Sequence, residues 1–161
     1  MSYREVKLMI QSFEDGTYPK EAWTHRAHFI MALWYTYHEP IHKAKKLIKE
    51  GIKNYNVRVG GKNTDDAGYH ETITELYIQI IVQYQLSFTT DYNFEILLEG
   101  LDNQVFLDKE FPFNYYQKHR LMSKEARKRW VVPDLKPILG LEIVQPAMPS
   151  PRPKYIVKSK A

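Results

Sequence analysis

The sequence predicts an all-α protein, a single-domain bundle of about six or seven helices with an extended, proline-rich C-terminal tail. Apolar residues recur at three- and four-residue steps in several segments, as they do on the buried face of amphipathic helices. No segment alternates like a half-buried strand, apart from a short fragment at Tyr155–Val157, and no repeat is present. A chain of 161 residues is long enough for one hydrophobic core. We therefore expect a helical domain over residues 1–138 and an extended or partly disordered tail over residues 139–161.

Three helices are predicted in the N-terminal part of the chain. The first covers Tyr3–Phe13 and stops at the turn residue Gly16. The second covers Trp23–Tyr37, has Thr24 as a candidate N-cap, and is apolar around most of its circumference, which favours a central position. The third begins at Pro40 and runs to about Tyr55. Four residues of the first helix should be buried: Val6, Met9, Ile10 and Phe13. Five lysines of the third helix should form a solvated face: Lys43, Lys45, Lys46, Lys49 and Lys53.

The fourth predicted helix is the most deeply buried one. It begins near Tyr69, and its apolar residues form one core-facing stripe: Ile73, Leu76, Tyr77, Ile80, Ile81 and Tyr84. The loop before it contains Gly60 and Gly61, and four of its polar residues are candidate caps: Asn63, Thr64, Asp65 and Asp66. His70 lies on the buried stripe, so its imidazole should point into the protein. We expect the second and fourth helices to pack side by side.

Shorter elements are predicted in the C-terminal half. Asp91 is expected to cap a fifth helix that runs to about Leu98, and a helical turn is expected at Val105–Glu110. An aromatic connection follows, and Ser123 begins another helix that ends near Trp130. Because prolines and sparse apolar residues mark the chain beyond Leu141, we expect this tail to be dispensable for the core.

Composition excludes several classes of chemistry and of protein. There is no cysteine, which excludes disulfides, thiolate metal sites and cysteine nucleophiles and fits a reducing compartment. No apolar run approaches the roughly 20 residues that a membrane span requires, and the N-terminus lacks the layout of a signal peptide. The sequence therefore predicts a cytoplasmic protein with no membrane association.

Three histidines are the main candidates for a functional site. With Thr24 as N-cap, His25 and His28 share one face of the second helix, and His70 starts the stripe of its expected neighbour. Three imidazoles are a common ligand set for zinc or a similar divalent ion and leave a position for water or substrate. In this hypothesis the enzyme acts on a small polar substrate, with His70 and Glu71 as candidate catalytic residues. Glu71 or a nearby tyrosine is the general base or orients a ligand.

Two alternatives use the same residues without a metal. In the first, the histidines perform acid–base chemistry or bind a small polar or anionic ligand. The candidate ligand-binding residues in that case are Tyr55, Asn56, Asn63, Thr64, Tyr69 and Arg127. In the second alternative the network is structural, since buried histidines often bond to backbone or tyrosine, loop polar residues cap helices, and Arg127 ties the last helix to the bundle. The sequence leaves open whether the chain is an enzyme and whether it forms homo-oligomers.

A third class of function is a nucleic-acid or protein-binding module. The net charge is +4, and six cations gather in one short segment: Lys118, Arg120, Lys124, Arg127, Lys128 and Arg129. Such a segment suits phosphate contacts. Against this function, the positive excess is small and no nucleic-acid-binding motif is present, so the segment is also explained as a solvated helix face.

Several motifs together resemble those of an uncharacterised family of small, mainly bacterial helical proteins. They are WTHxxH at Trp23–His28, YNxxxG at Tyr55–Gly60, NTxxxGYHET at Asn63–Thr72, ARxxW at Ala126–Trp130 and PDL at Pro133–Leu135. The resemblance spans Phe13 to Leu135 and excludes the tail. It implies that these positions belong together in one fold, and it implies no reaction, because the function of the family is unknown.

Overall fold

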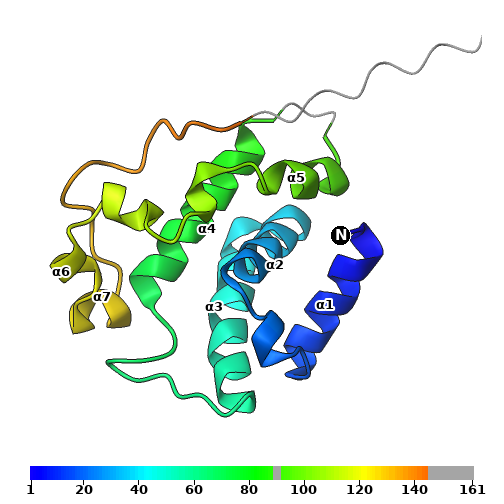
Figure 1. Cartoon of the computed structure of the whole chain (residues 1–161), viewed down its shortest axis with the longest axis horizontal. Coiled ribbons are helices and arrows are strands. Elements are labelled where there is room, and N and C mark those ends of the chain that lie inside the picture. The colour runs from blue at the N-terminus through cyan, green and yellow to red at the C-terminus, as the bar shows by residue number, and fades with distance from the viewer. Residues whose placement is uncertain (89–91, 145–161) are drawn as a thin grey trace, which may run out of the picture.

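The computed structural model describes residues 1–88 and 92–144, and within these residues the chain is helical and contains no strand (Figure 1). The α-helices are α1 (Tyr3–Asp15), α2 (His25–His38), α3 (Ile41–Arg58), α4 (Glu71–Leu86), α5 (Phe94–Leu101), α6 (Lys118–Leu121) and α7 (Lys124–Lys128). Three 3-10 helices join them: η1 (Lys20–Ala22), η2 (Val105–Leu107) and η3 (Phe111–Asn114). The prediction of an all-α fold is confirmed. No helix of the described residues combines the length and apolarity that crossing a membrane needs.

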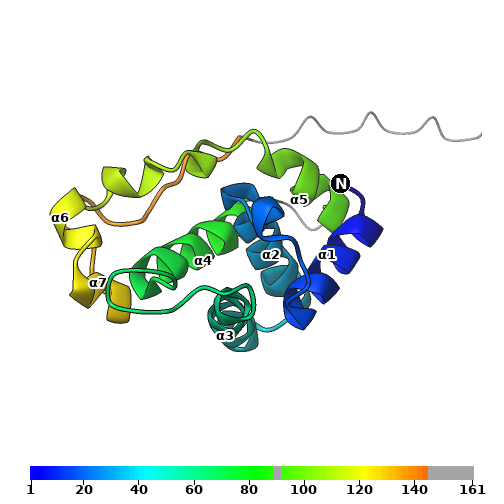
Figure 2. The ribbon, with the colours of Figure 1, turned by 60° about the horizontal axis from the view of Figure 1, so that its bottom comes forward.

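Helices α2 and α4 form the centre of the bundle. α2 packs against α1, α3, α4 and α5, while the other side of α4 packs against α7. In both ribbon views α4 lies between α2 and the α6–α7 pair (Figures 1 and 2). The predicted side-by-side packing of the second and fourth helices is therefore confirmed. It brings the N-terminal histidines of α2 close to the C-terminal third of the chain.

The boundaries of α1 and α2 follow from their caps. Ser2 accepts the N–H of Glu5 and the Glu5 carboxylate accepts the Ser2 N–H, which is a capping box. Gly16 ends α1 in the left-handed conformation with φ of 71°. Thr24 caps α2 by accepting the N–H of Ala27, as predicted, so His25 and His28 are the first and fourth helical residues. The four predicted core residues of α1 are all buried.

The start of α4 differs from the prediction. The N-cap is His70 itself, whose Nδ1 accepts the N–H of Ile73, and none of the four polar loop residues caps this helix. Asp91, which was expected to cap the fifth helix, lies outside the described residues. Within them, Asn93 is the N-cap of α5. Helices α6 and η3 were not predicted, because four-residue helices carry too little periodicity to be recognised.

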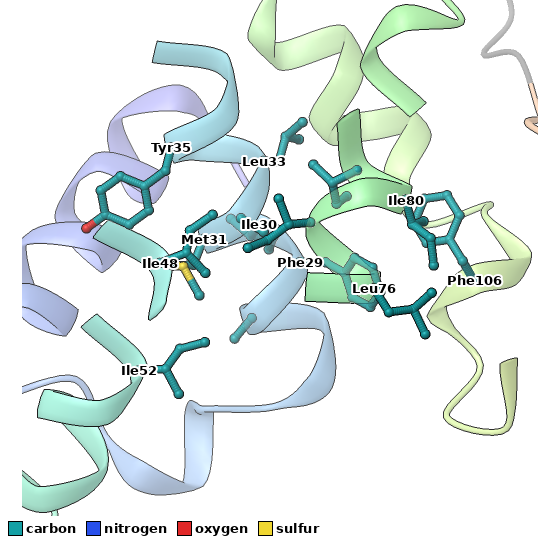
Figure 3. Close-up of a cluster of buried hydrophobic side chains, with 14 of the residues drawn as sticks. Phe29, Ile30, Met31, Leu33, Tyr35, Ile48, Ile52, Leu76, Ile80 and Phe106 are labelled. Carbon is teal, nitrogen blue, oxygen red and sulfur yellow. The ribbon is translucent and has the colours of Figure 1, made fainter. Parts of the chain in front are cut away.

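The core is continuous across α2, α3 and α4 (Figure 3). Its central side chains come from these three helices and from η2: Phe29, Ile30, Leu33, Ile48, Ile52, Leu76, Ile80 and Phe106. α4 is buried on more than the predicted stripe, because Thr72, Glu75 and Ile78 are buried as well. Two of these three are polar, so the packing of α4 requires partners for them.

Part of the predicted tail docks onto the bundle. The buried side-chain amide of Gln104 donates to the Val144 carbonyl at 2.8 Å and accepts the Val144 N–H at 3.1 Å. Leu141 and Ile143 pack against the core. At the end of the predicted helical domain, Gln83 donates to the carbonyl of Ile138. The remainder of the tail, including the fragment at Tyr155–Val157, lies outside the described residues.

Truncation after Gly140 is expected to destabilise the domain, contrary to the expectation from composition. It would leave the Gln104 amide short of two hydrogen bonds, and a buried polar group without its partner costs about 1–3 kcal/mol. Thermal unfolding should show a lower Tm than for a chain truncated after Val144, which retains both bonds. Equal melting temperatures for the two truncated chains would show that residues 141–144 contribute nothing to stability.

Candidate functional site

A cavity of about 420 Å³ lies between the N-terminal half of α2, helices α3 and α4, and a segment from Lys109 to Met122. This volume falls within the range of roughly 300–1,000 Å³ that is typical of small-molecule sites. The apolar lining residues are Phe29, Met31, Ala32, Ile48, Ile52, Ile73, Ile78, Pro112, Phe113, Leu121 and Met122. The polar lining residues are His25, His28, Thr74, Tyr77 and Lys109. The cavity is thus mainly apolar, with a small set of polar groups.

His25 and His28 both line this cavity, as their shared helical face predicts. His28 Nδ1 lies 2.8 Å from the carbonyl oxygen of Thr24, so Nδ1 donates and Nε2 is left as the acceptor of the neutral ring. His25 packs edge-on against Phe29 and Tyr77. Its Nε2 is buried and has no hydrogen-bond partner among the described residues. The ring that carries this unpartnered nitrogen lines the cavity, which makes it a natural contact for a ligand.

Both cavity histidines favour the neutral form. Burial lowers the pKa of His25, and the charge of Lys109 lowers it further, against a smaller opposite effect of Asp108. Burial also lowers the pKa of His28, which is partly offset by its hydrogen bond to the Thr24 carbonyl. The indole of Trp23, with ring centroids 4.1 Å apart, covers the His28 ring. At neutral pH these rings therefore offer one N–H and one lone pair each.

Tyr77 and Lys109 complete the polar part of the lining. Burial raises the pKa of Tyr77, so its hydroxyl stays protonated, and this hydroxyl has no hydrogen-bond partner among the described residues. Lys109 is exposed at the cavity and forms no ion pair with any described residue. No carboxylate belongs to the lining, so its one formal charge is positive.

His70 lies elsewhere and does not line the cavity. It is buried, as predicted, but its Nδ1 accepts the Ile73 N–H at 3.2 Å and its Nε2 donates to the Leu121 carbonyl at 2.9 Å. With both nitrogens engaged, the ring has no lone pair left for a metal. The described residues contain no group of three or more His, Asp or Glu side chains that could hold a metal ion. The structure therefore does not assemble the predicted site of His25, His28 and His70.

Glu71 belongs to a charged cluster between α3 and α4. Its carboxylate accepts the Tyr69 hydroxyl at 2.6 Å and the Lys49 ammonium at 2.5 Å. Lys49 also lies 2.8 Å from the buried carboxylate of Glu75, which pairs with Lys45 as well. Although burial alone would raise the pKa of Glu75, the hydrogen bonds from both lysines hold it below its usual value. Glu71 is thus placed in an ion-pair network outside the cavity lining.

This cluster corrects the prediction of a solvated lysine face on α3. Lys45 and Lys49 are half-buried and bind the carboxylates of α4, while the Lys53 ammonium lies 4.5 Å from the ring centroid of Tyr69. Three of the five lysines therefore contact the region that begins α4. Lys45 and Lys49 are four residues apart on α3, as Glu71 and Glu75 are on α4. The sequence does not show that these two pairs face each other, because that depends on how the helices pack.

The predicted ligand-binding residues hold the loop between α3 and α4. Asn63 accepts from the Asn56 amide and the Tyr69 N–H and donates to the Lys53 carbonyl. Thr64 bonds with the backbone of Ala67 through both its N–H and its hydroxyl. At the other end of the loop, Arg127 donates to the carbonyls of Gly68 and Tyr69.

Tyr55 is buried on α3 and donates its hydroxyl to the Tyr18 carbonyl. Like the loop residues, it is absent from the cavity lining. All six predicted ligand-binding residues therefore make contacts within the protein, in agreement with the alternative of a structural network. None of them lines the cavity.

Five lining residues after α5 were not identified as site residues from the sequence: Lys109, Pro112, Phe113, Leu121 and Met122. They lie in the irregular segment after α5, where no periodicity indicates which side chains face inward. Tyr77 was predicted on the core-facing stripe, and it does pack against the core. The sequence did not predict that this residue also lines a cavity. These residues join His25 and His28 at one site only because the segment packs beside α2 in the folded protein.

The basic segment around α6 and α7 is engaged within the protein. Lys124 lies 3.6 Å from Asp66 and Lys128 lies 2.9 Å from Asp65, so both pair with the loop before α4. Arg129 pairs with Glu125 in the same helical turn. Arg120 donates to the Val132 carbonyl. Three of the six cations thus pair with a carboxylate, and Arg120 and Arg127 are held by backbone carbonyls, so part of the positive charge of this segment is balanced within the protein.

No protein family, curated protein or solved structure matches this chain. The assignment of function therefore depends on the geometry of the site alone.

Gly68→Ala is expected to destabilise the protein more than Gly60→Ala does. Both glycines have positive φ, 78° and 83°, so both substitutions introduce the same backbone strain of about 1 kcal/mol. A Cβ at Gly68 would also overlap the Lys62 carbonyl oxygen and lie 2.9 Å from Asn63 Oδ1, while a Cβ at Gly60 meets open space. Urea unfolding should place the Gly68 variant at least about 1 kcal/mol below the Gly60 variant. Equal costs would mean that the loop shifts freely.

Stability is expected to fall as the pH drops below about 6.5. Burial is the largest cause of the lowered pKa of His25, His28 and His70, whose ordinary value is 6.5. The unfolded chain then binds protons at a higher pH than the folded chain, so the free energy of unfolding decreases on acidification. Urea unfolding at pH 7.5 and 5.5 measures this loss. The variant His70→Asn, which keeps a capping side chain, should lose less; a wild type equally stable at both pH values would contradict the assignment.

Proposed function

We propose that this protein binds a small, largely apolar molecule with a polar head in the cavity between α2, α4 and the segment from Lys109 to Met122. The observation that carries the proposal is the combination of a mainly apolar cavity of about 420 Å³ with a buried, unpartnered His25 Nε2 in its lining. Apolar surface supplies affinity, and a few polar groups select the orientation of a ligand.

The lining favours this function over the metal-dependent one. His25 and His28 have no third histidine or carboxylate beside them in the lining, so the proposal contains no metal ion. It corresponds to the metal-free ligand-binding alternative. The sequence predicted a small polar or anionic ligand for that alternative, whereas the lining favours a more apolar one. The intramolecular pairing of the basic segment supports it over nucleic-acid binding.

A second candidate function is acid–base catalysis on the bound molecule, and it is favoured by the orientation of His28. Its Nδ1–H is held by the Thr24 carbonyl, and its Nε2 carries the lone pair of a ring that burial keeps neutral. This is the state that a general base requires. Binding precedes any such step, so the binding test comes first.

The binding test uses a neutral fluorescent probe, N-phenyl-1-naphthylamine, whose emission rises in apolar surroundings. Wild type should bind it saturably, and Ala32→Phe should abolish binding because Ala32 lines the cavity and a benzyl group would occupy the space. Ala67→Phe places the same side chain on the exposed loop and serves as the matched control. Circular dichroism verifies that both variants retain the helical fold. Equal probe binding by the two variants would refute the proposed site.

A bound ligand should also raise the melting temperature. At a free concentration 100 times its Kd, a ligand that binds only the folded state adds about 2.7 kcal/mol to the free energy of unfolding. In thermal shift measurements, the probe should therefore raise the melting temperature of wild type and of the Ala67→Phe control but not that of Ala32→Phe. Stabilisation of all three to the same extent would place binding outside the cavity.

A further inference from the structure

The polar groups of the cavity are not spread evenly over its wall. His25 and Tyr77 lie side by side, with ring centroids 5.3 Å apart, and both rings contact Phe29. Lys109 lines the cavity as well and follows η2, whose Phe106 ring has its centroid 5.3 Å from that of the same Phe29 ring. An imidazole, a phenol hydroxyl and an ammonium therefore gather in one part of a mainly apolar cavity.

Each of these three polar side chains lacks a partner within the described residues, and His25 donates from Nε2 in one of its two neutral tautomers. The Lys109 ammonium forms no ion pair, the Tyr77 hydroxyl forms no hydrogen bond, and the buried Nε2 of His25 is unsatisfied. Three buried tyrosine hydroxyls elsewhere in the protein are paired: Tyr55, Tyr84 and Tyr116 each donate to a backbone carbonyl. An end of a cavity that offers donors and one positive charge complements an oxyanion.

One nearby carboxylate has to be considered. The charge of Asp108 acts on both His25 and Tyr77, but Asp108 does not line the cavity. Its Oδ1 accepts the N–H of Glu110 at 2.9 Å, which holds the carboxylate on the turn outside. It reduces the positive potential at this end of the cavity without removing the three donors.

We infer that the ligand is an amphipathic carboxylic acid, bound as its monoanion, with its carboxylate at Lys109, His25 and Tyr77 and its apolar body against the aliphatic wall of α3 and α4. This inference rests on the proposed function of the cavity and specifies its ligand class. The body would contact Ile48, Ile52 and Ile78, which are apolar and lie on the wall formed by those two helices.

The test compares three ligands with the same alkyl chain: octanoate, 1-octanol and octylammonium. Each is titrated at pH 7.5 as a competitor of bound N-phenyl-1-naphthylamine. Octanoate should bind at least threefold more tightly than octanol, and octylammonium should bind most weakly. Raising the salt concentration should weaken octanoate binding and leave octanol binding unchanged, because only the former includes a charge pair.

Lys109→Met removes the positive charge and keeps an alkyl side chain, and Lys62→Met is the matched control. Lys62 is also exposed, does not line the cavity, and has the same charge. Lys109→Met should lower octanoate affinity at least threefold and leave octanol affinity unchanged, whereas Lys62→Met should change neither. Asp108→Asn, which keeps the acceptor for Glu110 N–H, should bind octanoate as tightly as wild type or more tightly.

The outcomes separate the two proposals. Octanol binding as tightly as octanoate, octylammonium binding most tightly, or equal effects of the two lysine substitutions would overturn the carboxylate assignment while the cavity remained a binding site. Failure of the probe and of all three ligands to bind wild type would overturn the proposed function itself, and the ligand class with it.

Discussion

A single imidazole, that of His70, connects the start of the central helix to the C-terminal third of the chain. Its Nδ1 caps α4 and its Nε2 donates to the carbonyl of Leu121. Because Leu121 and Met122 line the cavity, the same ring positions one of the cavity walls. A protonated ring has no lone pair with which to accept the Ile73 N–H, so the cap depends on a neutral imidazole, whereas the Nε2–H that donates to Leu121 is present in both forms. Burial, which lowers the pKa of His70, favours that state.

The first two turns of α4 are held by polar contacts on two further sides. Thr72 is buried and bridges to the backbone of Arg129 and Val131 through its hydroxyl. On the α3 side, Glu71 and Glu75 share Lys49. A buried carboxylate is tolerated only with such partners, and removing one partner costs more than the pair contributes. These polar contacts orient α4. The apolar side chains that α4 contributes to the cavity, such as Ile73 and Ile78, therefore do not have to fix its position.

Elements with strong local signals were predictable from the sequence, and elements that depend on distant contacts were not. The Thr24 cap, the core face of α1 and the packing of α2 on α4 follow from periodicity and capping residues near each other in the chain. The use of His70 as a cap was not foreseeable, since Ser, Thr, Asp and Asn dominate that position and four of them precede it. His25 and His28 were identified as site residues from their spacing. Lys109 joins them only because an irregular segment folds back over α2.

The cavity has walls from segments that are far apart in the chain, since α2 lies near the N-terminus and the segment from Lys109 to Met122 lies in the C-terminal third. Such long-range contacts form late, because closing the intervening loops costs entropy before any contact compensates it. During synthesis, the nascent chain could build α1 to α4 while one side of the cavity was still missing. The apolar residues of α2 and α4 that line the cavity would then stay exposed on the ribosome until Met122 emerged from the exit tunnel.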